Sequence, residues 1–167
     1  MAGKPGEFEL IKEILSPLTT GMPGALGLTD DAALLTVEPG HQLVITKDAM
    51  VAGVHFFENE KPALIAKKLL RTNLSDLAAM GAKPIGYLLA TAWTTDCDAN
   101  WIRSFADGLR DDQDQYGIGL LGGDTVKTSG PLTLSLTALG SVPTGKSLRR
   151  NSAKVSDLVY VSGTIGD

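Results

Sequence analysis

The sequence predicts an α/β fold in which two main helices pack on one face of a mixed β-sheet. Two long runs carry apolar residues at helical spacing, one at residues 61–81 and the other at residues 98–115. Two shorter segments are typical of strands, because residues 85–93 are almost wholly apolar and residues 132–139 alternate leucine with threonine or serine. A hydrophobic content of 43% in 167 residues is enough for one substantial core.

The first 57 residues are expected to add a short helix and a hairpin to this plan. The predicted elements are a helix at 8–18, a loop at 21–27, strands at 34–37 and 42–46 joined as a hairpin, and a loop at 49–57. Asp30 and Asp31 would then stand at the entrance of the first strand, and Asp48 would follow the end of the second.

The rest of the chain has clear helix signals. Pro62 suits the first turn of one main helix and Gly81 suits its end, whereas Asp98 is a predicted N-cap of the other. The further expected elements are strands at 118–121, 132–139 and 158–162, with a basic loop at 142–151. Asp124 would follow the end of the first of these strands, directly after two glycines.

A domain boundary is expected near residue 150. The strand predicted at 158–162 and the glycine-bearing turn after it normally lead into a further unit of structure. We therefore assign residues 1–150 to an N-terminal domain, and residues 151–167 to the start of a C-terminal domain that is otherwise absent from this sequence.

The composition argues against several classes of protein. The formal net charge of −4 offers no basic footprint for nucleic acid. Cys97 is the single cysteine, which fits a reducing compartment and excludes an intrachain disulfide. Residues 1–9 lack the apolar stretch of a signal peptide, and no apolar run is long enough to span a membrane. We therefore expect a cytoplasmic protein that binds neither nucleic acid nor a membrane.

The candidate functional residues are aspartates near predicted strand ends, where α/β proteins place their ligands. They are Asp30, Asp31, Asp48 and Asp124, together with Asp76, which lies late in the first main helix. Grouped aspartates without cysteine ligands suit Mg²⁺, which completes its shell with water and phosphate oxygens. The glycines before Asp124 would let a phosphate approach the backbone closely. The pattern favours a magnesium–nucleotide site and phosphoryl transfer.

Each of these residues also has a structural explanation. The pair Asp30-Asp31 and the residue Asp124 suit turns, and Asp48 suits a solvated strand end. Asp76 could occupy a surface position on an amphipathic helix, although helix interiors disfavour aspartate. The residue types alone leave these alternatives open.

Five short blocks of sequence occur in an order that indicates a family resemblance. They are residues 6–11 (GEFELI), 30–34 (DDAAL), 48 with 51–56 (VAGVHF), 73–82 (NLSDLAAMGA) and 122–125 (GGDT). Together they resemble the N-terminal half of the thiamine-monophosphate kinase family, over residues 6–167. That family is similar in fold to aminoimidazole ribonucleotide synthetase, selenophosphate synthetase and the hydrogenase-maturation dehydratase.

The resemblance implies the N-terminal domain of a two-domain, ATP-dependent enzyme. Its reaction would be the Mg²⁺-dependent phosphorylation of thiamine monophosphate to thiamine diphosphate, and the chain would form a homodimer through its sheets. The implied metal ligands are Asp31, Thr46, Asp48, Asp76 and Asp124; the implied ATP contacts are Gly123, Asp124 and Arg150; and the implied substrate contact is His55. No residue is expected to act as a strong base, because the acceptor phosphate is already anionic and catalysis rests on alignment and charge neutralisation.

Two residues depart from the family pattern. Thr29 replaces a usual glycine, and Lys47 replaces a usual threonine, where a lysine could displace a metal or replace its charge. Two other functions stay open: another ATP-dependent member of the same superfamily, or a dimerising nucleotide-binding domain that catalyses nothing. Selenophosphate synthetase fits less well, because that family uses a reactive cysteine or selenocysteine near its N-terminus and no cysteine precedes Cys97 here.

Overall fold

The computed structural model describes residues 6–161 and residue 163. The predicted mixed sheet is confirmed, and its four strands lie in the order β1-β4-β2-β3. The strands are β1 (His41–Val51), β2 (Lys83–Trp93), β3 (Gly119–Lys127) and β4 (Thr133–Pro143). Strand β4 runs antiparallel to both of its neighbours, whereas β3 runs parallel to β2. Strands β1 and β3 are therefore the two edges of the described sheet.

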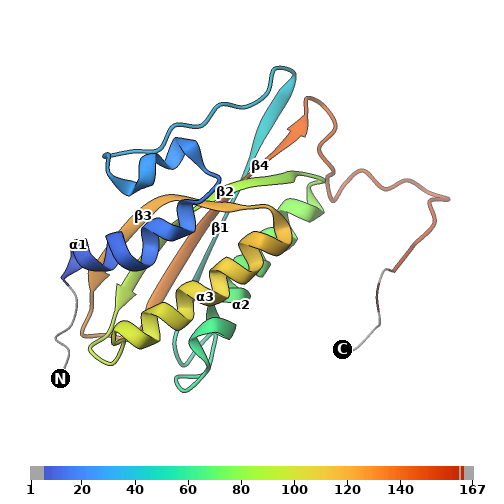
Figure 1. Cartoon of the computed structure of the whole chain (residues 1–167). Coiled ribbons are helices and arrows are strands. Elements are labelled where there is room, and N and C mark those ends of the chain that lie inside the picture. Colours follow the sequence, from blue (N-terminus) through green and yellow to red (C-terminus); the bar gives the residue numbers. More distant parts are fainter. Residues whose placement is uncertain (1–5, 162, 164–167) are drawn as a thin grey trace.

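Two long helices cover one face of this sheet, as predicted (Figure 1). Helix α2 (Pro62–Ala79) begins with proline in its first turn and is followed by Gly81, whose φ of +68° suits glycine. Helix α3 (Ala99–Tyr116) is capped by Asp98, whose carboxylate accepts a hydrogen bond of 2.8 Å from the backbone N–H of Trp101. The sequence signals for both helices are thus confirmed.

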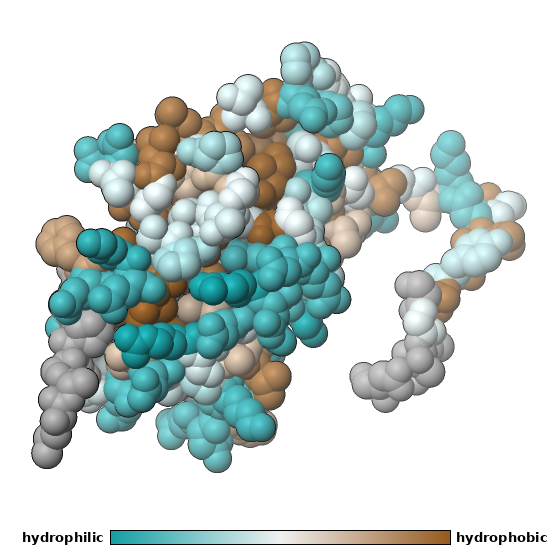
Figure 2. Space-filling model, viewed as in Figure 1, coloured by the Kyte–Doolittle hydropathy of each residue, from teal (hydrophilic) through white to brown (hydrophobic). Residues whose placement is uncertain are grey.

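The core lies between these helices and the sheet. Its fully buried side chains include Leu69, Leu70 and Leu77 of α2, Phe105 and Leu109 of α3, and Leu134 and Leu136 of β4. The outward face of α3 is hydrophilic, as its polar second half predicts (Figure 2). The apolar stripes of the two helices therefore meet the inner face of the sheet, and burial of this apolar area stabilises the fold.

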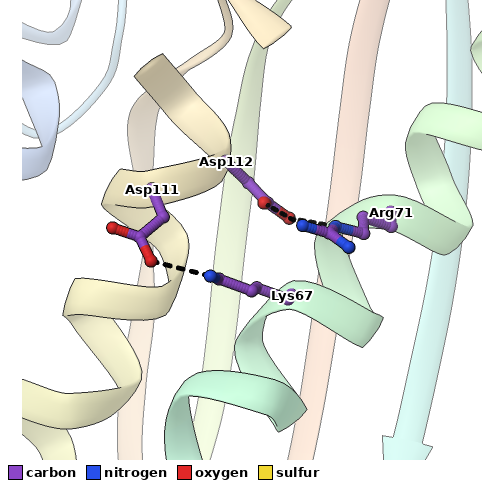
Figure 3. Close-up of polar contacts among 4 residues, drawn as sticks. All are labelled: Lys67, Arg71, Asp111 and Asp112. Atoms are coloured by element: carbon purple, nitrogen blue, oxygen red, sulfur yellow. Dashed lines mark hydrogen bonds and ion pairs between the residues drawn. The ribbon is translucent and has the colours of Figure 1, made fainter. Parts of the chain in front are cut away.

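Two ion pairs join α2 to α3 outside the apolar core (Figure 3). Lys67 Nζ lies 2.7 Å from a carboxylate oxygen of Asp111. Arg71 donates two hydrogen bonds to Asp112, of 2.9 and 2.8 Å, and the carboxylate of Asp112 is fully buried. These hydrogen bonds raise the pKa of the Arg71 guanidinium. The bidentate pair thus fixes the separation and rotation of the two helices.

The N-terminal segment is helical in pieces. It contains α1 (Glu7–Leu10), a π-helical turn (Ile11–Leu15) and 3₁₀ helices at Ser16–Thr19 and Pro23–Leu28. The predicted helix at 8–18 is confirmed as a helical region, but Pro17 lacks the N–H that a continuous α-helix would need. The loop predicted at 21–27 is in large part the second 3₁₀ helix.

Other strand predictions were wrong. Residues 34–37 form no strand, since the N–H of Leu34 bonds to the carbonyl of Gly24 instead of to a strand. The predicted hairpin is therefore absent, and β1 pairs with β4 along its whole length. Residues 158–161 also form no strand, because the segment after β4 runs away from the sheet and has no partner there (Figure 1). Ser162, the last residue of that prediction, lies outside the described residues.

Candidate functional site

The alternation of side chains along β1 divides the candidate residues between two faces of the sheet. Met50 is buried in the core under the helices, so Thr46 and Asp48 share its face by the period of two. Lys47 points to the opposite, open face, where its Nζ donates to Ser135 Oγ of β4 at 2.8 Å. Asp48 therefore lies within a strand, whereas the sequence analysis placed it after one.

On the helix side, α2 and β1 bring two candidate residues into contact. Thr46 Oγ1 donates a hydrogen bond of 2.6 Å to Asp76 Oδ2. Asp76 is exposed, so solvent and ions have access to its carboxylate. One turn earlier, Asn73 is fully buried, and its Nδ2 donates to the carbonyl of Leu69 at 2.9 Å. Within the described residues, Asn73 Oδ1 is one of two buried side-chain atoms without a hydrogen-bond partner.

The open face of the sheet holds a pocket of about 740 Å³ that gathers other candidates. Its polar lining includes Asp30, Asp31, Lys47, Asp124 and Ser135. Its apolar lining includes Leu88, Ala90, Leu121 and Leu139. The segment before β1 and the edge strand β3 thus contribute carboxylates to the same hollow, although they are about 90 residues apart in the chain.

Two of these carboxylates also have local structural roles. Asp124 Oδ1 accepts a hydrogen bond of 2.9 Å from the backbone N–H of Thr125, and Asp30 Oδ1 accepts one of 3.0 Å from that of Asp31. Asp124 lies inside β3, not after the strand as expected, because the strand continues through both glycines. These local bonds restrict the carboxylates but leave oxygen lone pairs that are able to bind a cation.

The glycines before Asp124 differ in what the fold requires of them. A Cβ at Gly123 would lie 1.8 Å from the carbonyl oxygen of Leu89, whereas one at Gly122 would lie 3.6 Å from the Leu88 side chain. Packing against β2 therefore demands glycine at residue 123, independently of any phosphate.

This difference gives a testable prediction. We expect Gly123→Ala to lower the free energy of unfolding by about 3 kcal/mol or more, because two backbones must separate. The matched variant Gly122→Ala should stay within about 1 kcal/mol of the wild type. Urea unfolding followed by circular dichroism checks both values, and equal losses would contradict the packing argument.

The four predicted carboxylates do not form one cluster in this structure. Among the described residues, no three side chains of histidine, cysteine, aspartate or glutamate are grouped so as to hold a metal ion. Asp48 and Asp124 lie on opposite edge strands with β4 and β2 between them. That separation is roughly 14 Å at the usual strand spacing. The site expected from the sequence is therefore divided, with Thr46, Asp48 and Asp76 on one face and Asp31 and Asp124 on the other.

The remaining candidates lie elsewhere. His55 follows β1, and its Nδ1 accepts a hydrogen bond of 3.0 Å from the backbone N–H of Val51. It lines a second pocket of about 310 Å³ together with Lys68, whose ammonium contacts the carbonyl of His55. Arg150 is exposed on the segment after β4. Lys68 and Ser135 were not predicted as site residues from the sequence, and the polar positions that alternate with leucine along β4 were the only signal for Ser135.

The sequence and the structure were also compared with known proteins. The family described as AIR synthase related protein, N-terminal domain, matches residues 29–142. The thiamine-monophosphate kinase of Caulobacter vibrioides is 55% identical over 99% of this chain and 47% of its own length. That of Escherichia coli K12 is 44% identical over 97% of this chain and 49% of its own length. The chain thus spans about half the length of the curated relatives it matches.

Solved structures of thiamine-monophosphate kinases are also similar in fold to this chain. A crystal structure of the thiamine-monophosphate kinase from Stenotrophomonas maltophilia has a TM-score of 0.77 and 43% identity, over 91% of this chain and 47% of that one. A structure described as AaThiL complexed with AMPPCP and TMP has a TM-score of 0.60 and 26% identity, over 83% and 42%. No helix in the described part of this chain is long and apolar enough to cross a membrane.

Proposed function

This chain belongs to the family of AIR synthase related proteins, N-terminal domain, and from that premise we propose that it is the ATP- and metal-binding half of a thiamine-monophosphate kinase. The whole enzyme would transfer the γ-phosphate of ATP to thiamine monophosphate and form thiamine diphosphate. The observation that carries the proposal is the 55% identity to such a kinase over 99% of the chain. Residues 151 onward would begin its second domain, and location in the cytoplasm stays a prediction.

The chemistry of the side chains fits Mg²⁺. Thr46, Asp48 and Asp76 offer hydroxyl and carboxylate oxygens on one face, and the Thr46–Asp76 contact of 2.6 Å already aligns two of these groups. Asp31 and Asp124 offer further carboxylates in the open-face pocket. Oxygen donors of this kind are the ligands that Mg²⁺ prefers. The metal would neutralise phosphate charge, while these residues fix where it binds.

The nucleotide and the acceptor would then be held by groups around these aspartates. We place the ATP phosphates near the β3 backbone at Gly123 and Asp124, with the exposed Arg150 as a further cationic contact. His55 would meet thiamine monophosphate through Nε2, because its Nδ1 is engaged by the Val51 N–H. Two anions brought together repel, so catalysis depends on charge neutralisation and on alignment for in-line transfer.

A homodimer through the sheet edges would remove the lateral separation between the strands that carry Asp48 and Asp124. Strands β1 and β3 each have one edge that pairs with no strand in the described sheet. Exposed edges of this kind are ready to pair with another chain. In a two-fold dimer, β1 of one copy would lie beside β3 of the other, so the strands that carry Asp48 and Asp124 would become neighbours, and metal ions and phosphate at the shared edge would link the two carboxylates. The exposed apolar residues Ile45 and Val126, on β1 and β3, are 61% and 49% accessible and suit such a contact.

This arrangement predicts complementation between two inactive variants. Full-length Asp48→Asn and Asp124→Asn proteins should each be inactive, but their heterodimer would keep one site in which both aspartates are intact. Co-expression with two affinity tags should therefore restore about half of the wild-type activity per purified heterodimer. If both residues served a site within one chain, every site of the heterodimer would lack one of them, and no activity would return.

The divided site also favours a second candidate for residues 1–167 alone. Without the remaining half of the protein, this domain could dimerise and bind magnesium–phosphate groups weakly without turnover. Isothermal titration with ATP, with and without Mg²⁺, tests both candidates on the full-length protein and on residues 1–167. We expect Mg²⁺-enhanced binding by the full-length protein and weaker binding by the fragment. A full-length protein that binds no ATP with Mg²⁺ would contradict the site assignment.

A further inference from the structure

Lys47 occupies a fixed position in the open-face pocket. Its Nζ donates to Ser135 Oγ at 2.8 Å, and Ser135 Oγ donates in turn to the carbonyl of Asp48 at 3.0 Å. In the sheet register Lys47 lies opposite Thr137 and Ala49 lies opposite Ser135, so the lysine side chain extends diagonally across two strands. These two hydrogen bonds hold the flexible lysine side chain in one place. A ligand that contacts it would therefore cost less conformational entropy on binding.

The pocket around Lys47 contains more acidic than basic side chains. It is the single cationic residue among those described as lining the pocket, whereas Asp30, Asp31 and Asp124 are all there. No carboxylate oxygen lies within ion-pair distance of its Nζ in the described part of the chain. An ammonium group has three N–H donors, and the bond to Ser135 uses one of them. Lys47 therefore neutralises none of the aspartates directly and keeps two donors for a ligand.

We propose that Lys47 binds the phosphate chain of the nucleotide directly and supplies a positive charge that needs no metal ion. This inference rests on the proposed function, since it assumes that the pocket receives a nucleoside triphosphate. The aspartates would take divalent cations, and those cations and Lys47 would contact different oxygens of the same phosphate chain. A compact ammonium suits this task because it binds phosphate oxygens as a point charge. Part of the affinity for ATP would then persist when Mg²⁺ is removed.

The test is ATP binding by the full-length protein in EDTA and, separately, in excess Mg²⁺. Lys47→Met keeps an unbranched side chain that is one atom shorter and removes its charge, so we expect about tenfold weaker binding of metal-free ATP. Lys47→Arg keeps the charge and should stay within about threefold of the wild type. Lys83→Met is the matched control, because Lys83 is an exposed lysine on β2 that does not line the pocket. Thermal unfolding of each variant shows whether the fold is retained.

Ser135→Ala separates direct binding from a structural role of Lys47. This variant retains the lysine charge but removes its anchor, so its loss of metal-free ATP affinity should lie between those of Lys47→Arg and Lys47→Met. The inference is overturned if Lys47→Met binds metal-free ATP as the wild type does, or if Lys47→Arg loses as much as Lys47→Met. It is also overturned if the wild type binds ATP with Mg²⁺ and not without it. A wild type that binds ATP in neither condition contradicts the proposed function itself.

Discussion

Replacing Asp76 with asparagine is expected to lower kcat of the full-length enzyme by at least about 100-fold. Asparagine has nearly the same shape and is still able to accept the hydrogen bond from Thr46 Oγ1, which is 2.6 Å long in the native chain. What it loses is the negative charge that holds a divalent cation against the phosphates. Because Asp76 is exposed, the free energy of unfolding should change by no more than about 0.5 kcal/mol.

Steady-state kinetics over a range of Mg²⁺ concentrations checks this prediction. Asp107→Asn is the matched control, because Asp107 is an exposed aspartate on the other long helix and lines neither pocket. The variant at residue 76 should need a higher Mg²⁺ concentration for half-maximal rate, whereas the control should behave as the wild type. If both variants keep the native kcat, Asp76 is a surface residue without a role in the reaction.

The second large effect concerns the ion pair between α2 and α3. Arg71→Ala should lower the free energy of unfolding by about 3–5 kcal/mol, because it leaves the fully buried carboxylate of Asp112 without its partner. Asp112→Ala should cost less, about 1–2 kcal/mol, since the Arg71 side chain is 48% accessible and water is able to solvate it. Removing Arg71 and leaving the buried carboxylate unpaired is thus expected to destabilise the fold more than removing the carboxylate itself.

Urea unfolding of the two single variants and of the double variant measures this asymmetry. The double variant should resemble Asp112→Ala, because no buried charge remains in it. Lys67→Ala is the control for an ion pair with an exposed carboxylate on the same helices, and it should cost less than about 1 kcal/mol. Equal losses for Arg71→Ala and Asp112→Ala would show that burial of the carboxylate does not dominate.

The helices that were predicted correctly from the sequence are determined by interactions between residues close together in the chain. The spacing of apolar residues in α2 and α3, the proline at residue 62 and the cap at Asp98 act within a few residues of one another. The strands whose limits were wrong depend on distant partners. Strand β1 extends to Val51 because β4 pairs with it along 11 residues, and residues 34–37 remain outside the sheet because no strand lies beside them.

The arrangement of the candidate site also depends on contacts between residues that are distant in the sequence. Thr46 and Asp76, both predicted metal ligands, are in contact, and their binding of a metal stays a prediction. The separation of Asp48 from Asp124 depends on the strand order, which places their strands at opposite edges. No local pattern encodes that order, and none encodes which face of the sheet a neighbouring chain would cover. The convergence of all four carboxylates therefore stays a prediction for the assembled protein.

The most direct test of the central claim is the product formed by the full-length protein from ATP and thiamine monophosphate. Chromatography of the reaction should show thiamine diphosphate and ADP in equal amounts, with formation that requires Mg²⁺ and is lost in Asp76→Asn. Aminoimidazole precursors offered as acceptors in the same assay should give no product. Hydrolysis of ATP without thiamine diphosphate, or reaction with an aminoimidazole precursor instead, would contradict the assignment.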